Sequence, residues 1–182
     1  MSMSKKTSFA RIKYRVQQVG RALLPTFTRE ELQWAASFLS AEEHEVFREM
    51  APADRRHCLD VAHICRSMAE QLAPDQRRLL LTAALLHDMG KRQGAIRLGH
   101  RIFFVLLGSR RSRIVPFKRW PLVGRPLHVI ARHARLGAAE AKKRNWAPDL
   151  VALIRHHHDQ SGSMSDENRR LLQMLQRADN LC

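Results

Sequence analysis

The sequence predicts an all-α protein, a helical bundle with a basic amphipathic helix near its N-terminus. Three observations support this prediction. Apolar residues recur three or four positions apart along most of the chain, and no period-two pattern of useful length is present. Hydrophobic residues make up 45% of the 182 residues, which is enough to form a core. Glycine and proline are scarce, at 8 and 7 residues, and this favours helices over a turn-rich β fold.

Three helices are expected before the main domain. Residues 9–23 place apolar side chains on one stripe and arginine and lysine on the opposite side. Two capping boxes, each a Ser or Thr followed three residues later by Glu, predict helices over about 28–39 and 40–50. The boxes pair Thr28 with Glu31 and Ser40 with Glu43. We expect residues 1–53 to form a helical extension that packs on a domain over 54–182.

The next two helices are expected to form the centre of the bundle. One runs from about Asp54 to Leu72, and Pro74 then breaks its pattern. The other runs from Asp75 to His87 and is apolar on most sides, so we expect it to be the buried central helix. Gly90 is well placed to terminate this second helix.

A basic insertion is expected after the central helix, over about 92–126. Its second half, residues 108–126, contains five glycines and prolines and is expected to be a loop rather than a helix. Further helical patterns lie near 97–107, 127–143, 149–158 and 166–181. Ser165 is the expected cap of the last helix.

The charge of the chain is strongly positive. It has 32 Lys and Arg against 17 Asp and Glu, a formal net charge of +15. Twelve basic residues and no acidic one lie between Asp88 and Glu140, and the first 29 residues also lack acids. Such a surface attracts polyanions, so nucleic acid, a nucleotide and an anionic membrane surface are the partner classes that it favours. A solvated basic surface without a dedicated partner is equally consistent with this charge.

The cysteines and the apolar runs argue against a disulfide-bonded protein and against a membrane-spanning one. Cys58, Cys65 and Cys182 include no C-x-x-C pair, which argues against a disulfide framework or a zinc knuckle and favours reduced thiols. The longest purely apolar run, residues 102–107, is far shorter than the about 20 residues that span a bilayer. No secretory signal pattern follows the N-terminus. We therefore expect a cytoplasmic protein without a transmembrane segment.

Histidines and aspartates suggest the chemistry. Imidazole and carboxylate together suit Fe, Mn, Zn and similar ions, and helix bundles build such sites from side chains that project inward. An ionised Asp88 after a long apolar run is costly to bury without a partner, which a metal ion would supply. Four of the ten histidines, His44, His63, His100 and His128, fit the structural or surface role of a lone helical histidine. The candidates are His57, His87-Asp88, His133, the run His156–His158 and Asp179.

These segments, in this order, resemble the HD superfamily of metal-dependent phosphohydrolases. The resemblance covers residues 54–182. It rests on R-H-C-L-D-V-A from Arg56, L-L-H-D-M-G-K ending at Lys91, H-A-R-L-G-A from His133, I-R-H-H-H from Ile154 and A-D-N around Asp179. It implies an HD-domain helical bundle and a cofactor of one or two divalent transition metal ions, such as Fe or Mn.

The resemblance also implies roles for single residues. The first ion would be held by His57, His87, Asp88 and Asp179, and the second by Asp88, His133 and His157. His158 is a rival or extra ligand, because three consecutive histidines allow a slip of one. Asp88 and Lys91 would be catalytic, with Lys91 holding the scissile phosphate as a point charge. A lysine at a helix end is also common for electrostatic reasons alone. Arg56 is a candidate substrate-binding residue.

The implied substrate is a phosphorylated small molecule, with a nucleotide as the leading candidate. The segment from Asp159, D-Q-S-G-S, departs from the D-G-x-G-Y-P of cyclic di-guanylate phosphodiesterases. Met89-Gly90-Lys91 replaces the acidic pair of guanosine tetraphosphate hydrolases. Both activities are therefore disfavoured, and the pattern is most similar to two-metal members that cleave dinucleoside polyphosphates symmetrically.

Two function classes remain open at this stage. One is the metal-dependent phosphohydrolase, and the other is an HD-domain binding or regulatory module whose basic surface binds RNA, anionic lipid or a protein partner. Other catalytic classes lack their motifs, since neither a G-x-x-x-x-G-K-[ST] loop nor a G-x-S-x-G elbow is present. The complete ligand set favours the enzyme.

Overall fold

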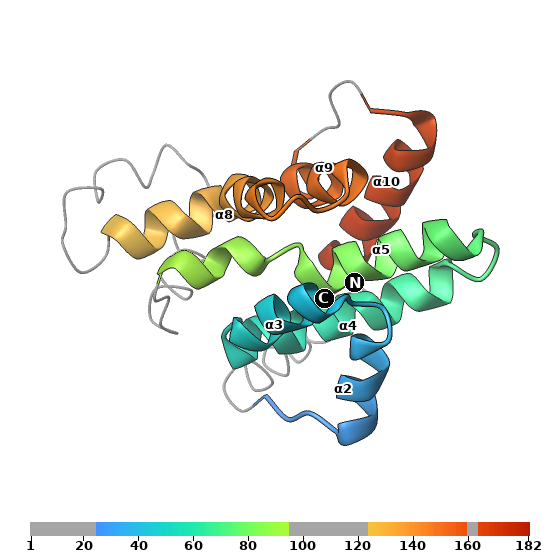
Figure 1. Ribbon diagram of the computed structural model, residues 1–182, viewed down its shortest axis with the longest axis horizontal. Coiled ribbons are helices and arrows are strands. Elements are labelled where there is room, and N and C mark those ends of the chain that lie inside the picture. The colour runs from blue at the N-terminus through green and yellow to red at the C-terminus, as the bar shows by residue number, and fades with distance from the viewer. Residues whose placement is uncertain (1–24, 95–123, 160–163) are drawn as a thin grey trace, which may run out of the picture.

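The computed structural model describes residues 25–94, 124–159 and 164–182, and every regular element in this part of the chain is a helix (Figure 1). The all-α prediction is therefore confirmed. None of these helices is long and apolar enough to cross a membrane. The elements are α2 (Arg29–Ala36), α3 (Ala41–Glu49), α4 (Pro52–Met68), α5 (Pro74–Leu86), the 3₁₀ helix η1 (Met89–Gly94), α8 (Gly124–Lys143), α9 (Pro148–His156) and α10 (Asp166–Leu181).

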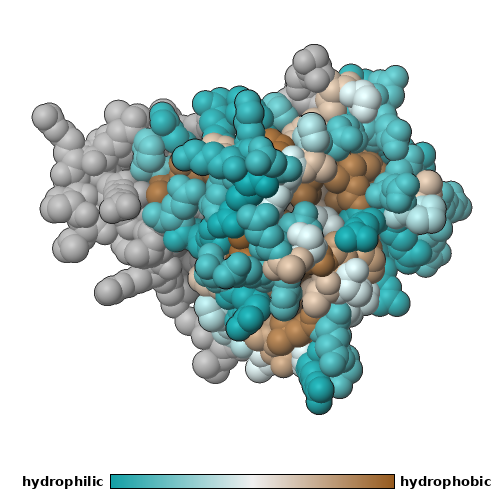
Figure 2. Space-filling model, viewed as in Figure 1, coloured by the Kyte–Doolittle hydropathy of each residue, from teal (hydrophilic) through white to brown (hydrophobic). Residues whose placement is uncertain are grey.

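Helix α5 is the centre of the bundle, as the sequence predicts. Every residue from Leu80 to Leu86 is buried, and α4, α9 and α10 all pack against this helix. Thr82 is the one polar residue of that run, and its hydroxyl donates to the carbonyl of Phe38 at 2.9 Å. The one hydroxyl in the buried run is therefore hydrogen-bonded, as buried polar groups usually are. The same bond links α5 to the connection between α2 and α3. Hydrophilic residues cover most of the face shown in Figure 2.

The helix starts follow local capping chemistry. Both predicted capping boxes are present, and Ser165 caps α10 by accepting from the backbone N–H of Asn168. Helices α4, α5 and α9 begin instead with proline in the first turn, where its missing N–H costs nothing. The sequence analysis placed these three starts one or two residues late. Pro74 in particular begins α5 rather than breaking a helix that reaches it, because α4 already ends at Met68.

Helix α8 begins at Gly124, three residues before the predicted start, and so takes in the end of the predicted insertion. The predicted helices over 9–23 and 97–107 lie outside the described residues, as does most of the insertion. The division of the chain at residue 53 stays a prediction.

Gly90 has a different role from the one predicted. Helix α5 ends at Leu86, before Gly90, which lies within η1. A Cβ at position 90 would lie 2.0 Å from the carbonyl oxygen of His133 and 2.6 Å from the backbone nitrogen of Gly137. No side chain fits in that space, so glycine allows η1 to pack directly on the backbone of α8.

Ion pairs hold the same region together from outside. Arg92 of η1 pairs with Glu49 of α3 at 2.6 Å and with Glu140 of α8. Arg144 pairs with Glu42 of α3 at 2.7 Å. These pairs join α3, η1 and the C-terminal end of α8, next to the segment that contains Asp88.

Candidate metal centre

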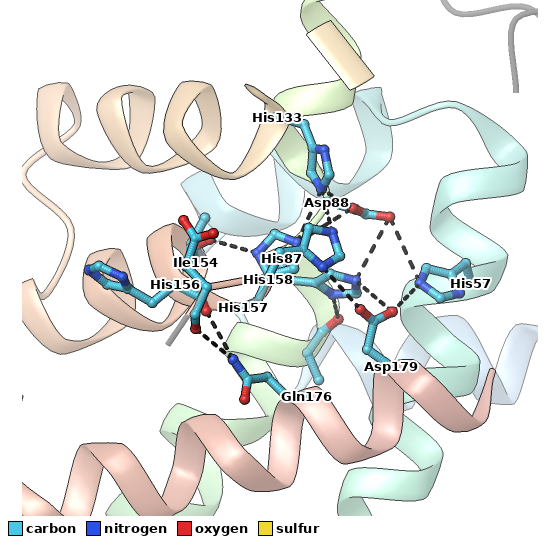
Figure 3. A network of polar contacts seen from close by, with 12 residues as sticks. His57, His87, Asp88, His133, Ile154, His156, His157, His158, Gln176 and Asp179 are labelled. Atoms are coloured by element: carbon cyan, nitrogen blue, oxygen red, sulfur yellow. Dashed lines mark hydrogen bonds and ion pairs between the residues drawn. The ribbon is translucent and has the colours of Figure 1, made fainter. Parts of the chain in front are cut away.

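The structure brings the predicted histidines and aspartates together at the middle of the bundle (Figure 3). They come from five places in the fold: α4, the end of α5, α8, the turn after α9, and α10. Asp88 lies at the centre, two residues after the last residue of α5. The residues that meet there are His57, His87, Asp88, His133, His157, His158 and Asp179.

The two oxygens of Asp88 face two different groups of histidines. Its Oδ2 lies 3.9 Å from Nε2 of His57 and 3.8 Å from Nε2 of His87. Its Oδ1 lies 3.1 Å from Nε2 of His133 and 3.9 Å from Nε2 of His157. A carboxylate in this position can bridge two metal ions, one on each side.

We call the group on the Oδ2 side the first subsite, formed by His57, His87, Asp88 and Asp179. Oδ1 of Asp179 completes it, at 2.9 Å from Nε2 of His57 and 3.8 Å from Nε2 of His87. The group on the Oδ1 side is the second subsite, formed by Asp88, His133, His157 and His158. Nε2 of His158 lies 3.1 Å from Nε2 of His133, so His158 belongs with this group.

Three of the histidines are oriented by their own helices. Nδ1 of His87, His133 and His157 lies 2.9, 2.6 and 2.7 Å from the carbonyl oxygen three residues earlier in each case. A carbonyl oxygen only accepts, so Nδ1 donates and the neutral imidazole presents the lone pair of Nε2 to the cluster. Such orientation of the ring by a partner on the other nitrogen is typical of metal-ligating histidines.

Several buried atoms of the cluster lack a suitable hydrogen-bond partner among the described residues. Nε2 of His133 and Nε2 of His157 lie 3.1 Å apart, although the anchors just described make both of them acceptors. Nε2 of His87 and Oδ1 of Asp88 are buried and have no aligned hydrogen-bond donor among the described residues. Buried polar atoms are costly when unpaired. Divalent metal ions between the rings and the carboxylate would satisfy all of them, so the residues fit the metal that the sequence predicts.

The electrostatics favour the protonation states that metal ligands need. Burial alone would raise the pKa of Asp88, but Lys91 and the neighbouring histidines outweigh it and hold this pKa well below its usual range. The pKa of Asp179 is likewise lowered against the effect of burial, mainly by His57 and His87. Burial lowers the pKa of His87 and, further, that of His157. At neutral pH these carboxylates are ionised and these imidazoles are neutral.

The cluster has a buried floor and a rim that reaches solvent. The side chains of the floor, His87, Asp88, His133 and His157, are at most 6% exposed. The side chains of the rim, His57, Lys91, His158 and Asp179, are 14% to 46% exposed. The ammonium of Lys91 pairs with Oδ2 of Asp88. The cluster therefore reaches solvent at the rim, where the partly exposed Lys91 contacts the central carboxylate.

The structure also shows where two further sets of predicted residues lie, the three-histidine run and Arg56. In the three-histidine run, the rings of His157 and His158 face the cluster and that of His156 points away (Figure 3). Arg56 is not part of the cluster, although it precedes His57. Its guanidinium lies 2.9 Å from both Glu31 and Asp60 and donates to the carbonyl of Thr26, so it anchors the start of α2 to α4. The substrate-binding prediction for Arg56 has no support from this geometry.

Sequence analysis missed Gln176, which bonds to the turn that contains His157 and His158. In the sequence, Gln176 could have been found by its position three residues before Asp179, because residues at this spacing share one face of a helix.

Comparison with known proteins gives one match. The family model described as HD domain matches residues 55–182, which is more than two thirds of the chain. No curated protein and no solved structure matches this sequence.

Proposed function

The chain belongs to the HD domain family, and from that premise we propose that it is a metal-dependent phosphohydrolase acting on a phosphorylated small molecule, with a nucleotide as the substrate class. The observation that supports this most is the arrangement around Asp88. One buried carboxylate lies between two groups of histidines, and Nε2 of His87 and Oδ1 of Asp88 are buried there without a hydrogen-bond partner among the described residues.

The two subsites divide the ligand roles. We propose that the four residues of the first subsite hold one ion, and that Asp88, His133 and His157 hold a second, with His158 as a further ligand. Divalent ions bound there would supply a nucleophile at neutral pH and would neutralise charge on phosphate oxygens. The floor residues keep bulk water away from this chemistry, because their side chains are almost fully buried.

Lys91 is the residue that we propose to hold the phosphate. Its ammonium lies at the rim and pairs with Oδ2 of Asp88. An incoming phosphate would offer a second anionic partner on the solvent side. The net charge of +15 would help to attract an anionic substrate before contact.

The test combines metal content with a substrate panel. The purified chain is loaded with Mn²⁺ or Fe²⁺, its metal is counted by elemental analysis, and phosphate release is measured from nucleotides, dinucleoside polyphosphates and simple phosphodiesters. We expect up to two ions per chain and hydrolysis of at least one nucleotide. His87→Ala should abolish hydrolysis, and His44→Ala, a histidine of α3 outside the cluster, should not. Metal-loaded protein that hydrolyses nothing would refute the proposal.

The alternative, a binding module for RNA, anionic lipid or a protein partner, depends on the acid-free stretch after Asp88. Most of that stretch lies outside the described residues. Binding of RNA or anionic vesicles that weakens steeply with salt would support it. The described cluster favours the enzyme, since a binding surface needs no converging buried histidines.

A further inference from the structure

The turn after α9 determines which histidines enter the cluster. The backbone N–H of Asp159 donates to the carbonyl of His156 at 2.9 Å and closes the turn. His157 and His158 are its two central residues, and His157 has φ −61° and ψ −15°, as expected at the first of them. Their rings face Asp88, and the ring of His156 points away (Figure 3).

One side chain from another helix binds both ends of this turn. Nε2 of Gln176 donates to the carbonyl of His156 at 3.1 Å and to the carbonyl of Asp159 at 2.9 Å. A carboxamide nitrogen has two hydrogens, so a single Gln can serve both carbonyls. Carbonyls at the C-terminal end of a helix lack partners within the helix. Gln176 therefore bonds both ends of the turn to α10, in addition to the bond from the Asp159 N–H that closes it.

We propose that Gln176 is a positioning residue that sets the register of the three-histidine run, so that His157 and His158 face Asp88 and His156 does not. The inference rests on the metal centre proposed above. It assigns two tasks to α10, which supplies Asp179 to the first subsite and holds the ligands of the second subsite in place. Nδ1 of His158 lies 3.8 Å from Oδ2 of Asp179, so the two tasks meet at the rim.

The competing explanation is that Gln176 only caps α9. A cap contributes to stability, but it leaves the affinity for metal unchanged once the protein is folded. A positioning residue changes the affinity of the subsite whose ligands it orients, and only of that one. Metal binding to each subsite separates the two explanations, whereas stability alone does not.

The experiment uses Gln176→Met, which keeps the length of the side chain and removes its donors. Gln173→Met is the matched control, because Gln173 lies one turn earlier on α10 and is exposed. Both variants and the parent are titrated with Co²⁺, and stoichiometry, dissociation constants and the ligand-field absorption bands are recorded. We expect Gln176→Met to bind the second ion about tenfold or more weakly, the range found when partners of metal ligands are lost. The first ion and the Gln173→Met control should match the parent.

Gln176→Glu provides a second and stricter test. The carboxylate has nearly the same shape but cannot donate, and its negative charge alone would tighten the binding of a cation. Weaker binding of the second ion by this variant would therefore trace to the lost N–H bonds. A parent that binds two ions, with both Gln176 variants binding them equally well, would overturn the inference alone. A parent that binds no metal would overturn the proposed function together with it.

Discussion

The floor and the rim of the cluster both contain histidine and aspartate but are held in place differently. Each floor histidine is fixed by a carbonyl of its own helix. The rim residues are held mainly by other side chains of the cluster, as in the pair of His57 with Asp179 and the pair of Lys91 with Asp88. A backbone anchor persists whatever occupies the site, whereas a side-chain pair can be exchanged. The floor histidines are therefore fixed by backbone atoms, whereas the rim side chains, His57 and Asp179 among them, are fixed mainly by one another.

The largest effect on metal binding and hydrolysis is expected from Asp88→Asn, because Asp88 is the floor residue that belongs to both subsites. The change keeps the size of the side chain and removes its charge, so both ions and all hydrolysis should be lost. Without metal, the free energy of unfolding should fall, since the change also breaks the ion pair of Asp88 with Lys91. Metal stoichiometry and the melting temperature in chelator test this. An Asn variant that keeps its full metal content would contradict the metal-bridging role.

A smaller and one-sided effect is expected from His133→Ala, a floor change confined to the second subsite. Bound metal should fall by about one of two ions, because the ligands of the first subsite lie on the other side of Asp88. His156→Ala is the matched control, since its ring points away from the cluster. Equal metal content in the His133 variant and the parent would make His133 a structural residue.

Lys91→Met tests the rim. Metal content should stay at the parent level, because Lys91 is not a ligand, but kcat/KM should fall about a hundredfold, as when one charge-stabilising donor is removed. Phosphate release and elemental analysis on the same sample give both numbers. Loss of metal with Lys91→Met would show that the lysine instead stabilises the ionised Asp88.

The smallest effect is expected from a change of pH, which acts on the histidines of both the floor and the rim. Burial lowers the pKa of His87 and His157 and lowers that of His158 to about 4. The unfolded chain takes up protons on these histidines below about pH 6.5, and the folded chain resists them. The free energy of unfolding of the metal-free protein should therefore fall as pH drops from about 6.5 toward 4. His63, outside the cluster, also has a lowered pKa and would add to this loss of stability. The measurement is therefore repeated with His63→Gln, which removes that contribution. Denaturant unfolding in chelator measures the effect, and greater stability at pH 5 than at pH 7 would contradict it.

The sequence predicts which side chains meet in the cluster but not which contacts hold them in place. His57, His87, Asp88, His133 and Asp179 were predictable because the side chain itself does the chemistry, so residue type and order identify it. The roles of Gln176 and Gly90 depend on backbone atoms of segments distant in sequence. Every residue has a backbone carbonyl, so residue types do not show which carbonyl Gln176 binds. They also do not show that η1 approaches α8 closely. The register of the three-histidine run was open for the same reason.

The hydrogen bond between His57 and Asp179 joins residues 122 positions apart in the chain. This separation in the sequence determines when during translation the first subsite can form. During translation α4 and α5 emerge and can pack well before α10 exists, since domains gain structure as the chain is made. An ion that needs all four ligands of the first subsite cannot template the early steps of folding. It can be captured only after the last helix has docked, so metal supply should limit maturation of the finished fold rather than its formation.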